Sequence, residues 1–347
     1  MIKKILISIF FISALLYSAL YFFLLNPVLT KKAPLFTRAS WELLKRDVVE
    51  ISGIQPARMF LNIHSLNKTA SLIEDRFIML GYNTKIQKFR VKDNIAERYQ
   101  KYPFYKKYSQ QKELIKTTEY KNVIARIGPE DSPIIIIGAH YDVCMNLPGA
   151  DDNASGVAAL LELARLLKLN ESKLTQQVEL VAYSLEEPPY FRSENMGSYH
   201  HAQSMKNKNI ELMISLETIG YFTDQENSQD YPAGILKHFF GSQGNFITLI
   251  GNVSGWFKVR QMKAYFKANS ELKIYSLAAP ARIPGIDFSD HLNYGPLGIP
   301  AFMVTDTAFY RNKEYHESGD TADRLDYVKI AQVVDGLLSI VLTVKSP

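Results

Sequence analysis

Five short segments of this chain place acidic residues and histidines directly after apolar runs. These segments are His140-Tyr141-Asp142, Gly149-Ala150-Asp151-Asp152-Asn153, Glu186-Glu187, Leu216-Glu217-Thr218 and Tyr315-His316. A sheet protein gathers its ligand-binding groups at the ends of its strands. The pattern therefore predicts that segments distant in the sequence meet at one edge of a sheet. One such segment would be a weak signal, but five together are specific.

The rest of the pattern predicts an α/β fold, with a mostly parallel mixed central sheet and helices on both faces. Apolar runs typical of strands cover residues 84–91, 122–127, 134–137, 178–183, 213–216, 246–250 and 301–304. Helical spacing covers residues 41–80, with a break near Gly53, and then 154–169 and 325–344. Asn153 can serve as the N-cap of the second helix. The turn at residues 128–131 predicts that the runs on either side of it are adjacent strands.

Residues 5–25 form an uncharged apolar run that matches the length needed to span a bilayer. Lys3 and Lys4 precede the run, so the N-terminus is expected in the cytoplasm and the catalytic body outside it. A cleaved signal peptide is the alternative, but its apolar region is usually shorter and ends at a small-residue cleavage site. We therefore expect a single-pass anchor in the cell membrane.

The domain organisation follows from this anchor. Residues 1–25 are the anchor, 26–37 a linker with two prolines, and 38–347 one catalytic domain. Within that domain, residues 85–122 form a basic, Tyr-rich excursion with eleven Lys/Arg and four Asp/Glu, and 222–289 form an expected insertion. The excursion is read as a solvated loop or a membrane-facing patch, and no nucleic-acid partner is expected.

A hydrolase with two metal ions requires residues of the types found in the five segments. Two cations about 3.5–4 Å apart polarise a carbonyl and activate a bridging water. One carboxylate must bridge the ions, and each ion needs further ligands from the protein. A separate carboxylate must take the proton of the water and return it to the leaving amine.

The local sequence suits each of these roles. His140 follows the apolar run 134–137, and Asp142 is close enough to orient its imidazole ring. Asp152 lies in a Gly-containing turn before a helix. Glu186 and Glu187 follow the strand 178–183, and because adjacent side chains point in different directions, one can bind metal while the other faces the water. Neutral imidazole and carboxylate are both good zinc ligands.

The motifs HYD, GADDNASG, a Glu pair after a strand, and a late YH followed by GDT resemble the co-catalytic zinc exopeptidases. That family includes the bacterial leucine-type aminopeptidases and the glutamate carboxypeptidases, and the similarity runs from about residue 122 to the C-terminus. The resemblance implies two zinc ions. It assigns His140 and Glu217 to one ion, Glu187 and His316 to the other, and a bridging position to Asp152.

The same resemblance makes Glu186 the general base and acid. The family usually has aspartate at the position of Glu217; glutamate also binds zinc, but its additional methylene shifts either the metal or the backbone. Tyr315 could donate its hydroxyl to the oxyanion of the transition state, or it could be a packing residue.

Two further residues compete for roles in the site. His291, in Ser289-Asp290-His291, is the alternative to His316 as a ligand, although the order of the family motifs favours His316. Cys144 is the only cysteine, so the chain has no intrachain disulfide. Its thiolate could bind metal, but no second cysteine supports a sulfur site, and a small buried residue is the preferred interpretation.

These expectations combine into a membrane-anchored zinc exopeptidase, an aminopeptidase acting on short peptides. One alternative is a glutaminyl-cyclase-like acyltransferase with a single zinc ion, which would not need both His140 and Glu217. The other is an inactive receptor-type ectodomain, which should have lost some motif residues, whereas this chain retains the full set. The sequence predicts neither the oligomeric state nor the end of the peptide that is cleaved.

Overall fold

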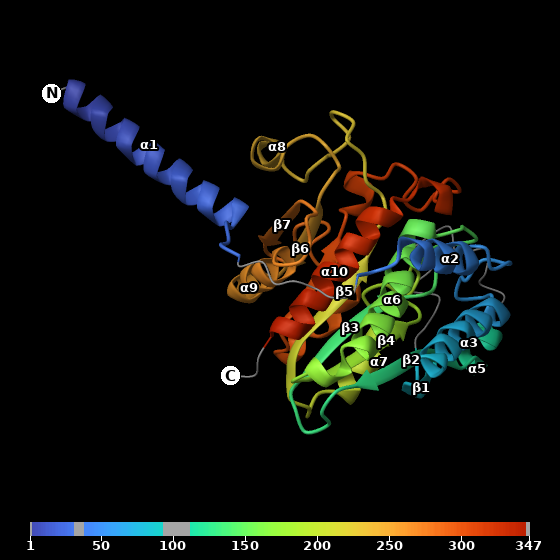
Figure 1. Ribbon diagram of the computed structural model, residues 1–347. Helices are drawn as coiled ribbons and strands as arrows, with labels where there is room; N and C mark the ends of the chain where they lie inside the picture. Colours follow the sequence, from blue (N-terminus) through green and yellow to red (C-terminus); the bar gives the residue numbers. More distant parts are fainter. Residues whose placement is uncertain (1, 31–37, 93–111, 345–347) are drawn as a thin grey trace.

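The structure is a computed structural model that describes residues 2–30, 38–92 and 112–344 (Figure 1). Its centre is an eight-stranded sheet with the strand order β1-β2-β4-β3-β5-β8-β6-β7. The strands are β1 (Asn83–Phe89), β2 (Tyr120–Ile127), β3 (Ile134–His140), β4 (Gln177–Tyr183), β5 (Ile210–Glu217), β6 (Ile247–Gly251), β7 (Ile274–Ala278) and β8 (Ala301–Thr305).

The sheet is mixed, with a parallel centre. Strands β4, β3, β5 and β8 are parallel neighbours, and β6 is parallel to β7. The antiparallel pairs are β1 with β2, β2 with β4, and β6 with β8. The predicted fold class is therefore confirmed, and each strand expected from the sequence is present.

One expected pairing is wrong. Strands β2 and β3 are not neighbours, because β4 lies between them and pairs with both. The turn after β2 therefore crosses the start of β4. At Gly128, which has φ +93°, a Cβ atom would lie 2.4 Å from the carbonyl oxygen of Gln176. A short turn between two apolar runs is thus compatible with a crossing over a third strand as well as with a hairpin.

Alternate residues of β3 pack into two separate apolar clusters, one on each face of the sheet. Ile135 and Ile137 belong to the larger cluster, which takes residues from α2 (Trp41–Ser52), α3 (Ile63–Met79), α6 (Gly156–Leu169), α9 (Trp256–Lys267) and α10 (Tyr327–Thr343). Ile134 and Ile136 belong to the smaller cluster, with Ala202 of α7 (Gly197–Ser204) and Tyr294. Because β3 is buried on both faces, its sequence is continuously apolar instead of alternating.

Two more segments bear on the sequence predictions. Residues 222–289 contain α8 (Ile235–Phe240), β6, α9 and β7, so this segment contributes two strands to the sheet. The basic excursion contains most of β1, α5 (Lys112–Thr117) and the start of β2, and its residues 93–111 lie outside the described part of the chain.

The N-terminal helix α1 (Ile2–Leu25) extends away from the body (Figure 1). Its C-terminal part contacts α8, α9 and β7. Residues Leu6–Leu25 are long and apolar enough to cross a membrane, a property that a signal sequence shares.

Candidate metal centre

The carboxyl ends of three parallel strands supply the first part of the site. His140 is the last residue of β3, and Glu217 is the last residue of β5. Glu186 and Glu187 follow β4, which lies beside β3. Parallel strands end at the same edge of a sheet, so these four side chains meet although up to 77 residues separate them.

Asp152 lies at the centre of the cluster. It belongs to the kinked segment Ala150–Ser155, directly before α6, in which Asp152 and Asn153 have non-helical backbone angles. Its Oδ1 atom lies 3.3 Å from Nε2 of His140, and its Oδ2 atom lies 3.0 Å from Nε2 of His316. The carboxylate therefore reaches the two imidazoles with different oxygen atoms, which is the arrangement needed for a bridging ligand.

Each imidazole also contacts a second carboxylate. Nε2 of His140 lies 3.4 Å from Oε2 of Glu217, and Nε2 of His316 lies 3.2 Å from Oε2 of Glu187. The structure therefore brings together all five residues that the sequence selects as ligands. Around Asp152, His140 lies near both Glu217 and Glu186, and His316 lies near Glu187.

Several polar atoms of this cluster lack a hydrogen-bond partner although they are buried. They are Nε2 of His140, both carboxylate oxygens of Asp152, Oε1 of Glu187 and Nε2 of His316. Burying an unpaired polar atom costs about 1–3 kcal/mol. A cluster of such atoms is therefore expected where a bound ligand supplies the missing partners. Two imidazoles and several carboxylates form a donor set that suits zinc.

The electrostatics also indicate a cation. Burial, reinforced by the charge of Asp152, raises the pKa of Glu187 to about 7. Burial likewise raises the pKa of Glu186 well above its usual value. Burial lowers the pKa of His140, but the charges of Glu217 and Glu186 outweigh this and raise it well above the ordinary value. A bound divalent cation would relieve this crowding of negative charge.

Asp142 contacts the His140 ring as expected, and it also makes contacts that the sequence did not predict. The atom nearest to Nδ1 of His140 is the backbone carbonyl of Asp142, at 3.2 Å, whereas its carboxylate lies 3.7 Å away. The two carboxylate oxygens also accept the backbone N–H groups of Glu186 and Glu187, each at 3.2 Å. Asp142 therefore fixes the loop that carries the Glu pair, and orients His140 mainly through its main chain.

Two buried residues that sequence reasoning missed hold the loop around Asp152. Asp320 accepts the backbone N–H of Asp151 at 2.9 Å and that of Asp152 at 3.1 Å. The guanidinium of Arg58 donates to the carbonyls of Tyr141 and Gly149, at 2.9 and 3.0 Å, and its burial lowers its pKa to about 10. Asp320 belongs to the GDT motif noted in the sequence, whereas Arg58 lies in no motif.

The competing residues occupy different surroundings. His291 is buried with its Nε2 3.0 Å from the carbonyl oxygen of Ile286, and it joins none of the groups that could hold a metal among the described residues. Cys144 is buried, and its sulfur lies within 4.8 Å of ligand atoms of Glu187 and His316. Ser289, also missed, donates its hydroxyl to Oε2 of Glu217 at 2.8 Å.

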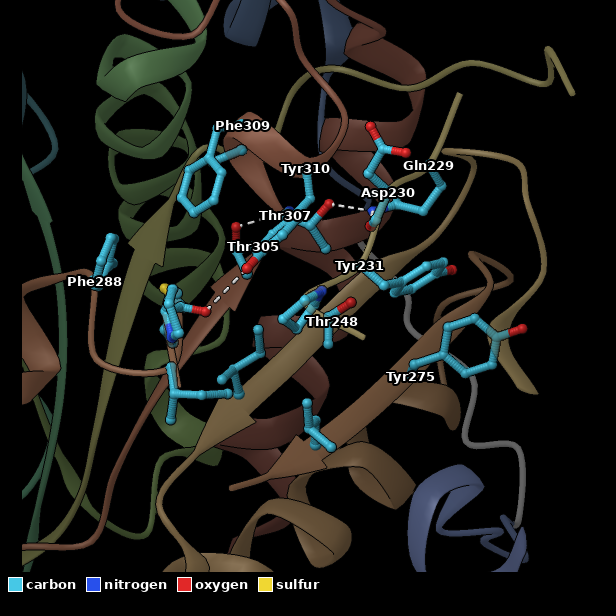
Figure 2. Close-up of a pocket in the computed structure, with 18 of the residues that line it drawn as sticks. Gln229, Asp230, Tyr231, Thr248, Tyr275, Phe288, Thr305, Thr307, Phe309 and Tyr310 are labelled. Carbon is cyan, nitrogen blue, oxygen red and sulfur yellow. Dashed lines mark hydrogen bonds between the residues drawn. The ribbon is translucent and has the colours of Figure 1, made fainter. Parts of the chain in front are cut away.

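A pocket leads away from the cluster, with Glu217 and Tyr315 among its lining residues. In Figure 2, Phe288 and Phe309 lie at one end of the pocket and Tyr231 and Tyr275 at the other. The ring of Tyr315 stacks on that of His316 with 4.0 Å between ring centroids. The lining is mostly apolar and aromatic, as in pockets that bind an apolar group beside a few polar anchors.

A mixed α/β sheet with two histidines and four carboxylates clustered at one edge defines a hydrolase of the zinc exopeptidase type. Comparison with known proteins agrees. Residues 122–341 match the model of peptidase family M28. The chain belongs to this family, which confirms the family expected from the motifs and makes the protein a peptidase, a hydrolase.

Relatives and solved structures extend this result. The chain is 44% identical over 315 residues to the uncharacterized protein YfbL of Escherichia coli, covering 88% of this chain and 89% of YfbL. It is 28% identical over 242 residues to the probable aminopeptidase YDR415C of Saccharomyces cerevisiae, covering 65% and 57% of the two chains.

Two solved structures share the fold at low identity. The zinc aminopeptidase BSAP of Bacillus subtilis has a TM-score of 0.63 at 15% identity, covering 87% of this chain and 94% of its own. The glutaminyl cyclase of Fimbriiglobus ruber has a TM-score of 0.62 at 17% identity, covering 92% and 100%. The fold is therefore shared by aminopeptidases and cyclases, and the site must decide between them.

Proposed function

We propose that the protein is a membrane-anchored zinc aminopeptidase that removes N-terminal residues from short peptides. The observation that carries this proposal is the convergence of His140 and His316 on opposite oxygens of Asp152, with the facing atoms unpaired. The aminopeptidase name of the yeast relative supports the same activity.

The centre is proposed to hold two zinc ions. His140 and Glu217 would bind one ion and Glu187 and His316 the other, with Asp152 shared between them. Bound zinc would polarise the scissile carbonyl and lower the pKa of the attacking water. The number of ligands supports two ions, because one tetrahedral ion would leave part of this set unused.

Glu186 is proposed to be the general base and acid. Its Oε2 atom lies 3.9 Å from Nε2 of His140, and in the ligand pairs its neighbour Glu187 takes the metal position. Glu186 would take a proton from the attacking water and deliver it to the nitrogen of the leaving amine. Asp142 holds it in place through the backbone, and the Tyr315 hydroxyl would donate to the oxyanion.

The pocket supports a preference for a bulky apolar side chain next to the scissile bond. Phe288 and Phe309 form one end of the pocket, and Ile250, Met303 and Leu277 also line it. Burying an apolar side chain there would stabilise the complex by about 25 cal/mol per Å² of apolar surface removed from water. We therefore expect Leu, Phe or Met substrates to be cleaved faster than Gly or Asp substrates.

The topology proposed from the sequence places α1 in the cell membrane and the domain 38–347 on the outer side. Lys3 and Lys4 before the apolar run support this orientation. Protease added to intact cells or spheroplasts should digest the body of the protein. Digestion only after the membrane is broken would contradict this orientation.

A single-zinc glutaminyl cyclase remains the second candidate, supported by the fold shared with the Fimbriiglobus ruber enzyme. The presence of both His140 and Glu217 beside Asp152 favours the peptidase. An inactive receptor-type ectodomain is less consistent with a complete ligand set.

Purified full-length protein assayed on paired peptides separates these possibilities. A Leu-containing peptide with a free amine should be cleaved, and the same peptide with a blocked amine should not. Cleavage that does not depend on a free N-terminal amine but requires a free C-terminus would indicate a carboxypeptidase. Formation of pyroglutamate from N-terminal Gln peptides without cleavage would indicate a cyclase, and neither reaction would indicate the inactive ectodomain.

A further inference from the structure

The C-terminal end of α1 is bound tightly to the body of the protein. Lys263 of α9 donates from Nζ to the carbonyl oxygens of Leu25 and Asn26, at 2.7 and 3.2 Å. The buried Asn26 side chain donates to Oγ of Ser276 at 3.0 Å. A cation on the last carbonyls of a helix satisfies acceptors that the helix cannot. The body therefore has a defined position relative to α1.

The helix α8 lies beside the last two turns of α1. The Tyr17 hydroxyl is 2.9 Å from Nε2 of His238, and the rings of Tyr17 and Tyr21 lie 5.9 and 6.4 Å from that of Phe239. Tyr17 precedes Leu25 by eight residues, which is about 12 Å along a helix. A membrane crossed by residues up to Leu25 would therefore reach α8.

The start of α9 lies against the same end of α1. The ring of Phe23 stacks on that of Trp256, with 6.2 Å between centroids and 3° between planes. We call α8 together with residues 253–257 the shoulder of the protein. Three other apolar side chains of the shoulder are exposed to solvent. Their exposed fractions are 60% for Ile235, 52% for Val253 and 80% for Phe257.

The segment of the chain that carries the shoulder is basic. Residues 231–270 contain no Asp or Glu, and their basic residues are Lys237, Lys258, Arg260, Lys263 and Lys267. Of these, Lys237 donates to Oδ1 of Asn227 at 2.6 Å, Lys258 is paired with Glu211, and Arg260 donates to the carbonyl oxygen of Pro27. The carboxylate of Glu226 accepts from Ser242, just after α8. Exposed apolar side chains beside basic ones are typical of surfaces that contact a bilayer with anionic headgroups.

We propose that the shoulder is a second membrane-contacting surface, which inserts Ile235, Val253 and Phe257 into the outer leaflet beside the anchor. This inference rests on the proposed anchor. The occupant is a lipid bilayer because the shoulder flanks the one helix of the described chain that is long and apolar enough to enter a membrane.

The shoulder also forms part of the pocket. Leu236 and Phe240 of α8 line its outer end, and the same residues pack with Leu24 and Leu25 of α1. The apolar end of the pocket therefore lies next to the proposed membrane surface. Peptides whose apolar side chains partition into the outer leaflet would meet the pocket at that surface.

The chain has only two tryptophans, Trp41 and Trp256, and this allows a direct test by fluorescence. The full-length protein would be reconstituted into phosphatidylcholine–phosphatidylglycerol vesicles with or without brominated phosphatidylcholine, which quenches tryptophan in the acyl region. Trp41→Phe leaves Trp256 as the only reporter. On a background of Trp41→Phe and Trp256→Phe, the substitutions Ile235→Trp, Phe10→Trp and Leu169→Trp report α8, the anchor and α6.

The proposal predicts that brominated lipid removes at least half of the emission of Trp256, Ile235→Trp and Phe10→Trp. Leu169→Trp, at a position that is 60% exposed on α6, should be quenched only by aqueous acrylamide. Quenching of Phe10→Trp alone would overturn the shoulder proposal and leave the anchor intact. Lack of quenching at all four positions would overturn both. Protection of Trp256 and Ile235→Trp from lipid and acrylamide alike would indicate that another copy of the chain covers the shoulder, and would also overturn the proposal.

Discussion

The hydroxyl of Ser289 donates to Oε2 of Glu217 at 2.8 Å, and both side chains are buried. The same carboxylate oxygen lies 3.4 Å from Nε2 of His140. Glutamate has one more rotatable bond than the aspartate that is usual in this family, so its carboxylate needs a partner to fix its direction. Ser289 provides that partner.

Ser289→Ala should therefore weaken zinc binding by about tenfold, because hydrogen bonds to metal ligands are typically worth about 10–100-fold in affinity. The measurement is zinc competition against a chelator of known affinity. The matched control is Ser215→Ala, which removes the hydroxyl that bonds Ser289 but not one that bonds Glu217. Equal affinities of Ser289→Ala and the unsubstituted protein would show that Glu217 is held by other contacts.

Tyr315→Phe tests whether the Tyr315 hydroxyl stabilises the oxyanion. Phenylalanine keeps the stacking on His316 and removes only the hydroxyl. Loss of one oxyanion donor typically lowers kcat about 10²–10³-fold, and we expect a loss of that size with unchanged zinc content. Tyr310→Phe, which alters a hydroxyl bonded to the carbonyl of Pro284 in the same pocket, is the control. An unchanged kcat would support the packing role instead.

The stability of the protein should depend on the ionisation of His291. Burial lowers the pKa of His291 to about 4, whereas the unfolded chain titrates near 6.5. The unfolded state therefore binds more protons between these values, and the free energy of unfolding should fall as the pH drops through this range. This amounts to about 2 kcal/mol between pH 7 and pH 5.

Urea unfolding at the two pH values measures this effect. His291→Gln, which retains an N–H donor for the carbonyl of Ile286, should show a smaller loss of stability on acidification. Because other groups titrate in the same range, the difference between the two proteins is the informative quantity. An identical pH dependence in both proteins would mean that folding does not lower the pKa of His291.

The strands that position the site are predictable from the sequence for a physical reason. Strands β3 and β4 are buried on both faces, so they are continuously apolar, and the polar residues that follow them mark their carboxyl ends. His140, Glu186 and Glu187 could therefore be selected as a group. The expected N-cap is wrong: Ser155 occupies that position of α6, although the Asn153 side chain still accepts the N–H of Gly156 at 3.2 Å.

What the sequence does not reveal are contacts between distant segments. Arg58 lies outside every motif, and only the fold brings its guanidinium to the loop before Asp152. Ser289 bonds Glu217 across 72 residues, and no local pattern signals this contact. The sequence also does not reveal that β4 lies between β2 and β3. A short turn can join two paired strands, or it can cross over a third strand that lies between them.

The adjacent residues Glu186 and Glu187 are proposed to have different roles, and their glutamine variants separate these roles. Glu186→Gln keeps the shape and cannot accept a proton, so kcat should fall by about 10²–10⁴-fold while the zinc content stays unchanged. Glu187→Gln replaces an anionic ligand by a poor neutral one and should lose one zinc ion. Both variants should lose activity, so metal content is the property that distinguishes them.

Elemental analysis of the full-length protein and these two variants is the most direct test of the proposed centre. The account predicts close to two zinc ions per chain in the active protein and in Glu186→Gln, and about one in Glu187→Gln. A chelator should remove the zinc and the activity together. No more than one tightly bound metal ion in fully active protein would contradict the two-zinc centre. Loss of an ion from Glu186→Gln, with both retained in Glu187→Gln, would reverse the assigned roles.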